Sequence, residues 1–238
     1  MGITFGLIVV TGLTGTVAYL AGLTGYAPLG LAFAPIAAAL AIALSVRHSW
    51  AALGLTAPRR PLSWGAIVLA ALLPLGGIAL SSGVQISPFA IIGFAILAIL
   101  VGFVEETLFR GVLLRAFAPS GVVPATVVTA VAFALAHTVT AISPDANAAT
   151  VARTVVFAFA FGVAAALMTT WTASILPAIL LHATFDFVGF IFTPRSAVQT
   201  DAVSILVCVA LVVVLTVTMA SAARRLRTPA AAQHPANG

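Results

Sequence analysis

The sequence of residues 103–111 is Phe-Val-Glu-Glu-Thr-Leu-Phe-Arg-Gly, which places two adjacent carboxylates and a guanidinium inside an otherwise apolar segment. A charged side chain at the centre of a lipid-facing helix costs roughly 2.5–3.5 kcal/mol. Glu105, Glu106 and Arg110 would each carry that cost if they were left unpaired, so they must face protein. The segment therefore predicts a helix that encloses a polar site within an apolar bundle.

Helical geometry separates the three charges. Glu106 and Arg110 are four residues apart and can form an ion pair on one face, whereas Glu105 lies about 100° around the helix from Glu106. One carboxylate is therefore neutralised locally and the other stays available. A desolvated carboxylate without a close partner suits a general base, so Glu105 is the candidate base and Glu106 with Arg110 the supporting pair.

The composition of the whole chain indicates an all-α, polytopic membrane protein. Of its 238 residues, 62% are hydrophobic and only 6% are charged, whereas about a quarter of the residues in a soluble domain are charged. The ten basic residues are all arginine, and their distribution is explained by membrane topology. Because no basic stripe is interleaved with aromatic residues, we expect no nucleic-acid partner.

Apolar runs of about 20 residues, separated by Pro, Gly and Arg, predict eight membrane spans. They cover about 3–24, 28–46, 63–81, 88–115, 122–141, 149–170, 174–193 and 202–222. We expect a single transmembrane domain over residues 1–223, with the buried polar site between the fourth, fifth and seventh spans. Residues 224–238 are expected to form a disordered basic tail rich in Ala and Pro.

The arginines also predict the orientation of the chain. With both termini in the cytoplasm, seven arginines lie on the inner side, Arg153 and Arg195 lie outside, and Arg110 lies within the membrane. The lipid bilayer is thus the first expected partner. The arginine-only, alanine-rich composition indicates the plasma membrane of a bacterium as the location.

Three further ionisable groups are expected at membrane depth. His137 ends the sequence Phe-Ala-Leu-Ala-His in the fifth span, and His182 and Asp186 share a helix face in the seventh. With Glu105 they suit the activation of water against a carbonyl group. Glu105 would take the proton and His137 would hold the water or relay that proton. His182 and Asp186 would stabilise the oxyanion or orient the leaving group.

The same side chains are also candidate ligands for zinc. Two histidines with one or two carboxylates, here Glu105, His137, His182 and Asp186, suit a zinc ion with an open position. The helical His-Glu-x-x-His pair of the standard zinc peptidases is missing from the sequence. Hydrolysis with a metal and hydrolysis without one therefore both stay open at this point.

Depth in the membrane sets a condition on this site. In a straight antiparallel hairpin of the fourth and fifth spans, Glu105 lies opposite residue 131, roughly 9 Å short of His137. We therefore expect a tilt of the helices, or a kink near Gly102 or Pro124, to close the gap.

Three motifs of the chain resemble those of the CPBP family, the CAAX-protease and bacteriocin-processing intramembrane endopeptidases. They are Glu105-Glu106-x-x-x-Arg110, Phe133-x-x-x-His137 and His182-x-x-x-Asp186, in that order on three hydrophobic segments. Gly111 after the arginine and the Phe-Ala-Leu-Ala-His segment also match. The motifs extend over residues 103–187, and the flanking spans resemble the family only in being apolar.

The resemblance implies an eight-helix membrane endopeptidase that cleaves a membrane-anchored peptide or protein. Glu105 would be the base, His137 and His182 would flank the water, and Asp186 would help bind the oxyanion. The most familiar family members carry Asn at this last position. A carboxyl donates a hydrogen bond only when protonated, so an ionised Asp186 would instead orient His182 or bind a metal. Some members of the family are described as metalloproteases and others as metal-independent.

Two alternatives to an enzyme also follow from the pattern. A non-catalytic immunity or scaffold protein would use the same fold without turnover. A proton-coupled transporter would use the same Glu, His and Asp residues as a proton relay. A transporter of that kind normally shows two related halves with broken helices, whereas here the polar residues are confined to three spans.

Overall fold

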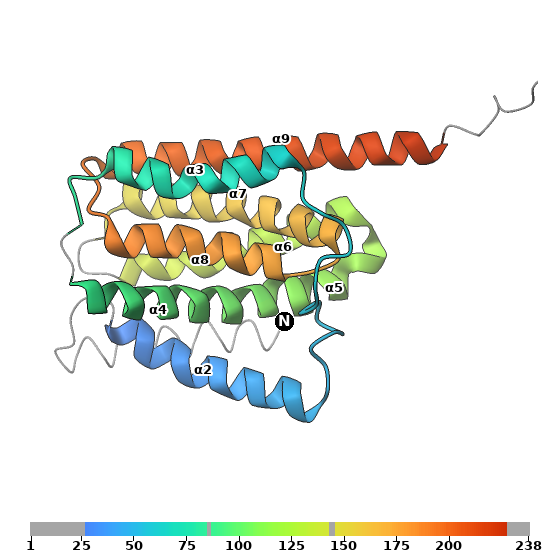
Figure 1. Cartoon of the computed structure of the whole chain (residues 1–238), viewed down its shortest axis with the longest axis horizontal. Coiled ribbons are helices and arrows are strands. Elements are labelled where there is room, and N and C mark those ends of the chain that lie inside the picture. Colours follow the sequence, from blue (N-terminus) through green and yellow to red (C-terminus); the bar gives the residue numbers. More distant parts are fainter. Residues whose placement is uncertain (1–26, 85–86, 143–145, 228–238) are drawn as a thin grey trace, which may run out of the picture.

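A computed structural model describes residues 27–84, 87–142 and 146–227, and these residues fold into a bundle of helices (Figure 1). The first expected span, residues 3–24, lies outside the described residues. The helical segments, in chain order, are α2 (Ala27–Val46), α3 (Trp64–Leu80), α4 (Pro88–Glu106), the π-helical segment η1 (Thr107–Leu113), α5 (Leu114–Phe117), the 3-10 turn η2 (Ala118–Ser120), α6 (Val122–Ala136), the 3-10 segment η3 (His137–Ile142), α7 (Ala148–Thr172), α8 (Leu176–Ile191) and α9 (Ala197–Arg227).

Each of the seven expected spans within the described residues overlaps a helix or a continuous run of helical segments of the structure. Five helical stretches in the described part of the chain are long and apolar enough to cross a membrane. The other two, α3 and α8, are shorter apolar helices of 17 and 16 residues. The chain is therefore an all-helical integral membrane protein, and the number of eight spans stays a prediction.

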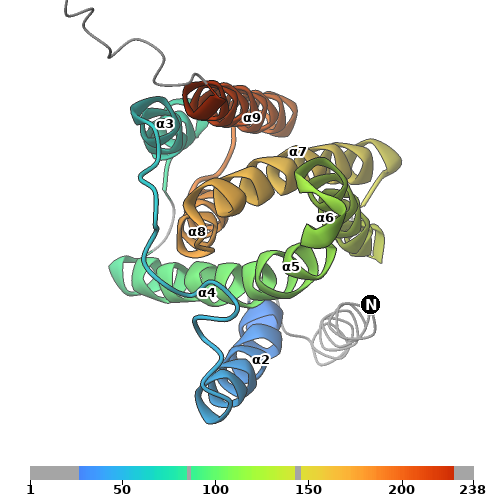
Figure 2. The same ribbon diagram turned by 90° about the vertical axis from the view of Figure 1, so that its right-hand side faces the viewer.

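The helices that carry the three motifs do not pack in chain order. α4 packs against α8 and α2, while α6 packs against α7, which also contacts α9. Viewed end-on, α4 to α8 enclose a common centre, with α2 outside α4 and with α3 and α9 on the opposite side (Figure 2). The expected departure from a straight hairpin is consistent with this packing, because α4 packs mainly against α8 and α6 against α7. The helical winding changes at Thr107–Leu113 and at His137, rather than at Gly102 or Pro124.

Local sequence explains where the helices begin. Ser63, Ser87 and Asn147 precede α3, α4 and α7, and the side-chain oxygen of each accepts a hydrogen bond from a backbone N–H in the first turn. Helix α7 ends at Thr172, the following Ala173 has a left-handed φ of 56°, and the chain then turns directly into α8. This tight connection makes α7 and α8 neighbours.

The last helix is longer than expected. α9 extends through Arg227, so residues 224–227 of the expected tail are helical. The rest of that tail, residues 228–238, lies outside the described residues.

Candidate active site

The first motif lies where α4 changes its winding. α4 ends at Glu106, and the next seven residues form the π-helical segment η1, which contains Arg110 and Gly111. Wider π turns occur frequently at functional sites in helices. A Cβ added at Gly111 would lie 3.2 Å from the carbonyl oxygen of Leu53, so glycine lets this turn pack closely against the preceding loop.

The ion pair expected in this motif is present and fully buried. Arg110 Nη1 donates to Glu106 Oε1 at 2.7 Å, and neither side chain is exposed. Arg110 Nη2 also donates to the carbonyl oxygen of Gly162 on α7 at 3.3 Å. Its guanidinium lies 4.5 Å from the centre of the Phe133 ring, a cation–π contact that further compensates for burial of the charge.

Glu106 has a second contact that the sequence did not indicate. His182 Nδ1 donates to Glu106 Oε1 at 2.9 Å, across 76 residues of sequence. Because the ion pair with Arg110 keeps Glu106 as an acceptor, this bond sets the orientation of the imidazole. The Nε2 atom of His182 therefore faces Glu105 and Asp186.

Close helix packing brings His182 to this place. A Cβ added at Gly102 of α4 would lie 3.0 Å from the carbonyl oxygen of Ile179 and 3.5 Å from Cβ of His182. Glycine therefore lets α8 pack at its present distance from α4, since any side chain would require α8 to shift slightly. The absence of this side chain allows the second histidine to reach both carboxylates of the first motif.

His137 lies at a junction between two kinds of helix. The α-helical part of the fifth span ends at Ala136, and the backbone N–H of His137 bonds to residues 134 and 135 instead of Phe133. The carbonyl oxygen of Phe133 therefore stays available, and it accepts a hydrogen bond from His137 Nδ1 at 2.9 Å. That bond leaves Nε2 as the free nitrogen of a neutral ring.

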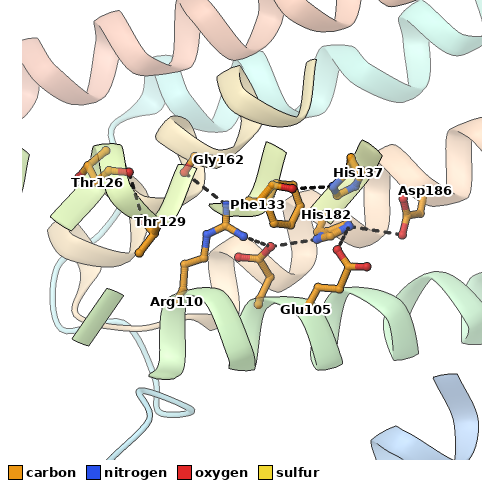
Figure 3. Close-up of polar contacts among 10 residues, drawn as sticks. Glu105, Arg110, Thr126, Thr129, Phe133, His137, Gly162, His182 and Asp186 are labelled. Atoms are coloured by element: carbon orange, nitrogen blue, oxygen red, sulfur yellow. Dashed lines mark hydrogen bonds and ion pairs between the residues drawn. The ribbon is translucent and has the colours of Figure 1, made fainter. Parts of the chain in front are cut away.

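All four predicted catalytic residues line one cavity. Glu105, His137, His182 and Asp186 border a space of about 230 Å³, whose remaining lining is apolar. Figure 3 shows the side chains of Glu105, His182 and Asp186 directed toward one another. The structure thus brings together side chains from α4, the end of α6 and α8, the three segments that correspond to the fourth, fifth and seventh expected spans.

Two carboxylate oxygens in this cavity have no hydrogen-bond partner in the described part of the chain. They are Glu105 Oε2 and Asp186 Oδ2, and both atoms are buried. His182 Nε2 lies 3.8 Å from the first and 3.6 Å from the second, too far for direct hydrogen bonds. Buried polar atoms of this kind are normally satisfied by a water molecule, a proton or a ligand.

The positions of the four ionisable side chains also bear on the expected zinc site. Among the described residues, no three His, Cys, Asp or Glu side chains are arranged to hold a metal ion. Glu105, His137, His182 and Asp186 therefore do not fit a zinc site in their present positions. Zinc stays a prediction from the residue types alone, and no step proposed below passes through a metal.

The structure adds an aromatic enclosure that sequence reasoning missed. The ring of Phe133 packs edge-on against Phe109 and lies 4.5 Å from the His137 ring, centre to centre. Phe161 of α7 lies 4.9 Å from the ring of His182 and 5.6 Å from that of Phe133. Phe133 belongs to the second motif, so its spacing from His137 was a usable signal. Phe161 had none, because phenylalanine is frequent throughout the chain.

The fold and this cavity define the class of the chain, an integral membrane protein with ionisable groups buried between its helices. Residues 87–188 match the family model described as type II CAAX prenyl endopeptidase Rce1-like. This match supports the resemblance to the CPBP family that the three motifs indicate, and it includes Glu105, His137, His182 and Asp186. A comparison with curated proteins finds no match.

Proposed function

We propose that the protein is an intramembrane endopeptidase that hydrolyses a peptide bond with water activated by Glu105. The observation that carries this proposal is the cavity of about 230 Å³ in which Glu105, His137, His182 and Asp186 meet. The family match to peptidases supports the same reaction class. Glu105 borders this cavity with a buried carboxylate oxygen that has no hydrogen-bond partner in the described residues, and such an oxygen is what a general base offers to a water molecule.

In this mechanism Glu105 and His137 hold the attacking water. Glu105 Oε2 is buried and lacks a hydrogen-bond partner among the described residues. His137 donates through Nδ1 to Phe133, so its Nε2 is free to accept from the same water. Glu105 takes one proton as the water oxygen adds to the carbonyl carbon, and it returns that proton to the leaving nitrogen as the carbon–nitrogen bond breaks.

The other two residues act on the carbonyl oxygen. His182 is held by Glu106, and its Nε2 lies beside Asp186. In their protonated forms Nε2 of His182 and the carboxyl of Asp186 donate hydrogen bonds to the developing oxyanion. Glu106 therefore orients His182. From the sequence alone, this role was expected of an ionised Asp186.

The substrate class follows from the location of the cavity. A buried site within an apolar bundle is reached by a polypeptide that is itself held in the bilayer, so we propose a membrane-anchored peptide or protein as substrate. We further propose that the protein resides in a bacterial plasma membrane with both termini in the cytoplasm.

The proposed function is tested with purified full-length protein in lipid nanodiscs. A panel of membrane-anchored peptides is incubated with the protein, and the products are sequenced by mass spectrometry. We expect Glu105→Gln and His137→Asn to lower the rate of cleavage by about 10²–10⁴-fold, the usual contribution of general acid–base catalysis. His48→Asn is the matched control, because His48 is exposed at the end of α2 and lies outside the cavity.

Two results would contradict the proposal. Unchanged cleavage by the Glu105→Gln protein would exclude this base, and a phenotype that survives without any cleavage would indicate a scaffold. The same assay in the presence of a strong chelator tests the zinc prediction, since a carboxylate-activated water predicts no loss of rate.

A further inference from the structure

A second and larger cavity lies next to the candidate active site. It measures about 310 Å³ and is bordered by residues of α3, α7, α8 and α9. Asp186 lines this cavity as well as the first one, so the two spaces are neighbours on either side of this residue. A group that occupies the second cavity therefore ends beside the residues that act on the scissile carbonyl.

The lining of this second cavity is mainly apolar. Its large side chains include Leu72, Leu73, Leu80, Phe157, Phe185 and Phe192. The charged residue at its far side, Asp201, is already paired, because Arg153 Nε donates to Asp201 Oδ2 at 2.7 Å. An anionic occupant would lose its hydration beside the two acidic residues of the lining, Asp186 and Asp201, whereas the mainly apolar lining suits an apolar one.

Glycines give the cavity its width. A Cβ added at Gly76 of α3 or at Gly189 of α8 would meet no atom within 4 Å, so both positions border open space. The neighbouring Gly77 is different, since its Cβ would lie 2.5 Å from Val188 and 3.0 Å from Phe192. Gly77 thus lets α3 pack directly on α8, while Gly76 and Gly189 leave room beside that contact.

One end of the cavity is closed by paired loops. Ser82 N donates to the carbonyl of Thr193 at 2.9 Å, and Arg195 N donates to that of Leu80 at 3.0 Å. Leu80, Phe192 and Pro194 at this pairing also line the cavity. The space is therefore a pocket with a fixed end, and it lies at the lower limit of the roughly 300–1,000 Å³ typical of small-ligand sites.

We propose that this second cavity is a specificity subsite for a large apolar side chain of the substrate, leucine or phenylalanine, close to the scissile bond. The proposal rests on the proposed function, because the shared residue Asp186 is what connects the pocket to the reaction. An occupant of helical diameter, about 10–12 Å, is too wide for a pocket of this volume. The substrate backbone is therefore extended near the scissile bond, and only its side chain enters the pocket.

The test fills the pocket and asks whether substrate preference changes. The probes are peptides anchored by one transmembrane helix, with each position near the cleaved bond set in turn to Ala, Leu, Phe or Asp. We expect the unmodified protein to prefer Leu or Phe over Ala at one position by about tenfold or more, the usual discrimination of an apolar pocket. Gly76→Leu and Gly189→Leu should abolish that preference, because they lower the rate for the Leu and Phe peptides to about that for the Ala peptide.

Gly93→Leu is the matched control, since a Cβ there also meets nothing within 4 Å but the residue borders neither cavity. It should keep the preference. A preference that persists in both pocket-filling variants overturns the proposal, and so does an equal loss of rate for every peptide. A lipid tail in the pocket would leave no preference to change, which also overturns it.

Binding to the Glu105→Gln protein separates this proposal from the proposed function. In the double variant Glu105→Gln/Gly76→Leu, the Phe peptide should bind more weakly than to Glu105→Gln alone, while binding of the Ala peptide stays the same. That result supports the subsite without any turnover. Equal binding of both peptides to Glu105→Gln overturns it. A lack of Glu105-dependent cleavage, by contrast, overturns only the proposed function.

Discussion

Glu106 accepts two hydrogen bonds through a single oxygen, from Arg110 at 2.7 Å and from His182 at 2.9 Å. It therefore connects the charge that is buried for structural reasons to the imidazole that faces the cavity. Glu105, one residue earlier, has no such ion pair with Arg110, and its Oε2 lies 3.8 Å from Nε2 of His182. Two adjacent residues of one type thus have different environments, and different effects follow from replacing them.

We expect Glu106→Gln to destabilise the protein far more than Glu105→Gln. Removing one partner of a buried ion pair leaves the other charge uncompensated, which costs about 3–5 kcal/mol. Removing the charge of Glu105 breaks no ion pair with arginine and should leave stability unchanged or slightly higher, as is common at catalytic positions. Thermal unfolding of both variants in the same detergent measures the difference.

A double variant shows whether the ion pair is the cause. In Glu106→Met/Arg110→Met the buried charges are gone together, so stability should return close to that of the unmodified protein. The double variant should nevertheless lack activity, because the imidazole of His182 has lost the carboxylate that accepts its Nδ1 hydrogen bond. Equal unfolding temperatures for the two single variants would contradict this account.

At the scale of the elements, the contact between α4 and α8 decides whether the site forms. Gly102 faces the backbone of α8 at Ile179 and the Cβ of His182, and it lies one turn before the two carboxylates. The π-helical segment η1 then follows directly after Glu106. Close packing before the motif and a wider turn after it together determine where Glu105 and Glu106 point.

We predict that Gly102→Ala lowers activity, because a Cβ 3.0 Å from the carbonyl oxygen of Ile179 shifts α8 by a few tenths of an ångström and the catalytic geometry is sensitive to such displacements. Its cost in stability should be about 1–3 kcal/mol for overpacking. Gly93→Ala on the same helix is the control, since a Cβ there meets nothing within 4 Å. It should retain full activity and gain up to about 1 kcal/mol from helix propensity. Comparable activity of the two alanine variants would show that the α4–α8 contact does not position the site.

At the scale of the whole molecule, the basic side chains are separated along the bundle. Arg60 precedes α3 and lies over the ring of Trp171 at 5.1 Å, near the C-terminal end of α7. Arg195 contacts Leu80, the last residue of α3, through its backbone. The 17 residues of α3, about 25 Å of helix, therefore separate these two arginines.

This separation gives a test of orientation. In a Cys208→Ala background, which removes the buried natural thiol, Arg60→Cys should react with an impermeant maleimide only from the cytoplasmic side. Arg195→Cys should react only from outside. Both substituted residues are exposed, so accessibility in the folded protein is not limiting. The reverse pattern in sealed vesicles would contradict the predicted orientation with both termini in the cytoplasm.

The elements and the four cavity-lining residues could be predicted, because the relevant signals are local. Apolar runs locate the helices, and a spacing of four residues places Glu106 and Arg110 on one face whatever the rest of the chain does. The packing partners of the helices could not be predicted in this way. Chain order does not determine which apolar helices pack together, so only the structure gave the pairing of α4 with α8 and of α6 with α7.

The sequence by itself determined that buried charges must be enclosed by helices, and that Glu106 and Arg110 would neutralise each other. Only the tertiary structure decided that His182 bonds to Glu106, that the Phe133 carbonyl holds His137, and that Asp186 borders two cavities. The physical reason is that helix spacing encodes contacts within a turn or two. Contacts between helices depend instead on where glycines permit close approach and where the helical winding changes.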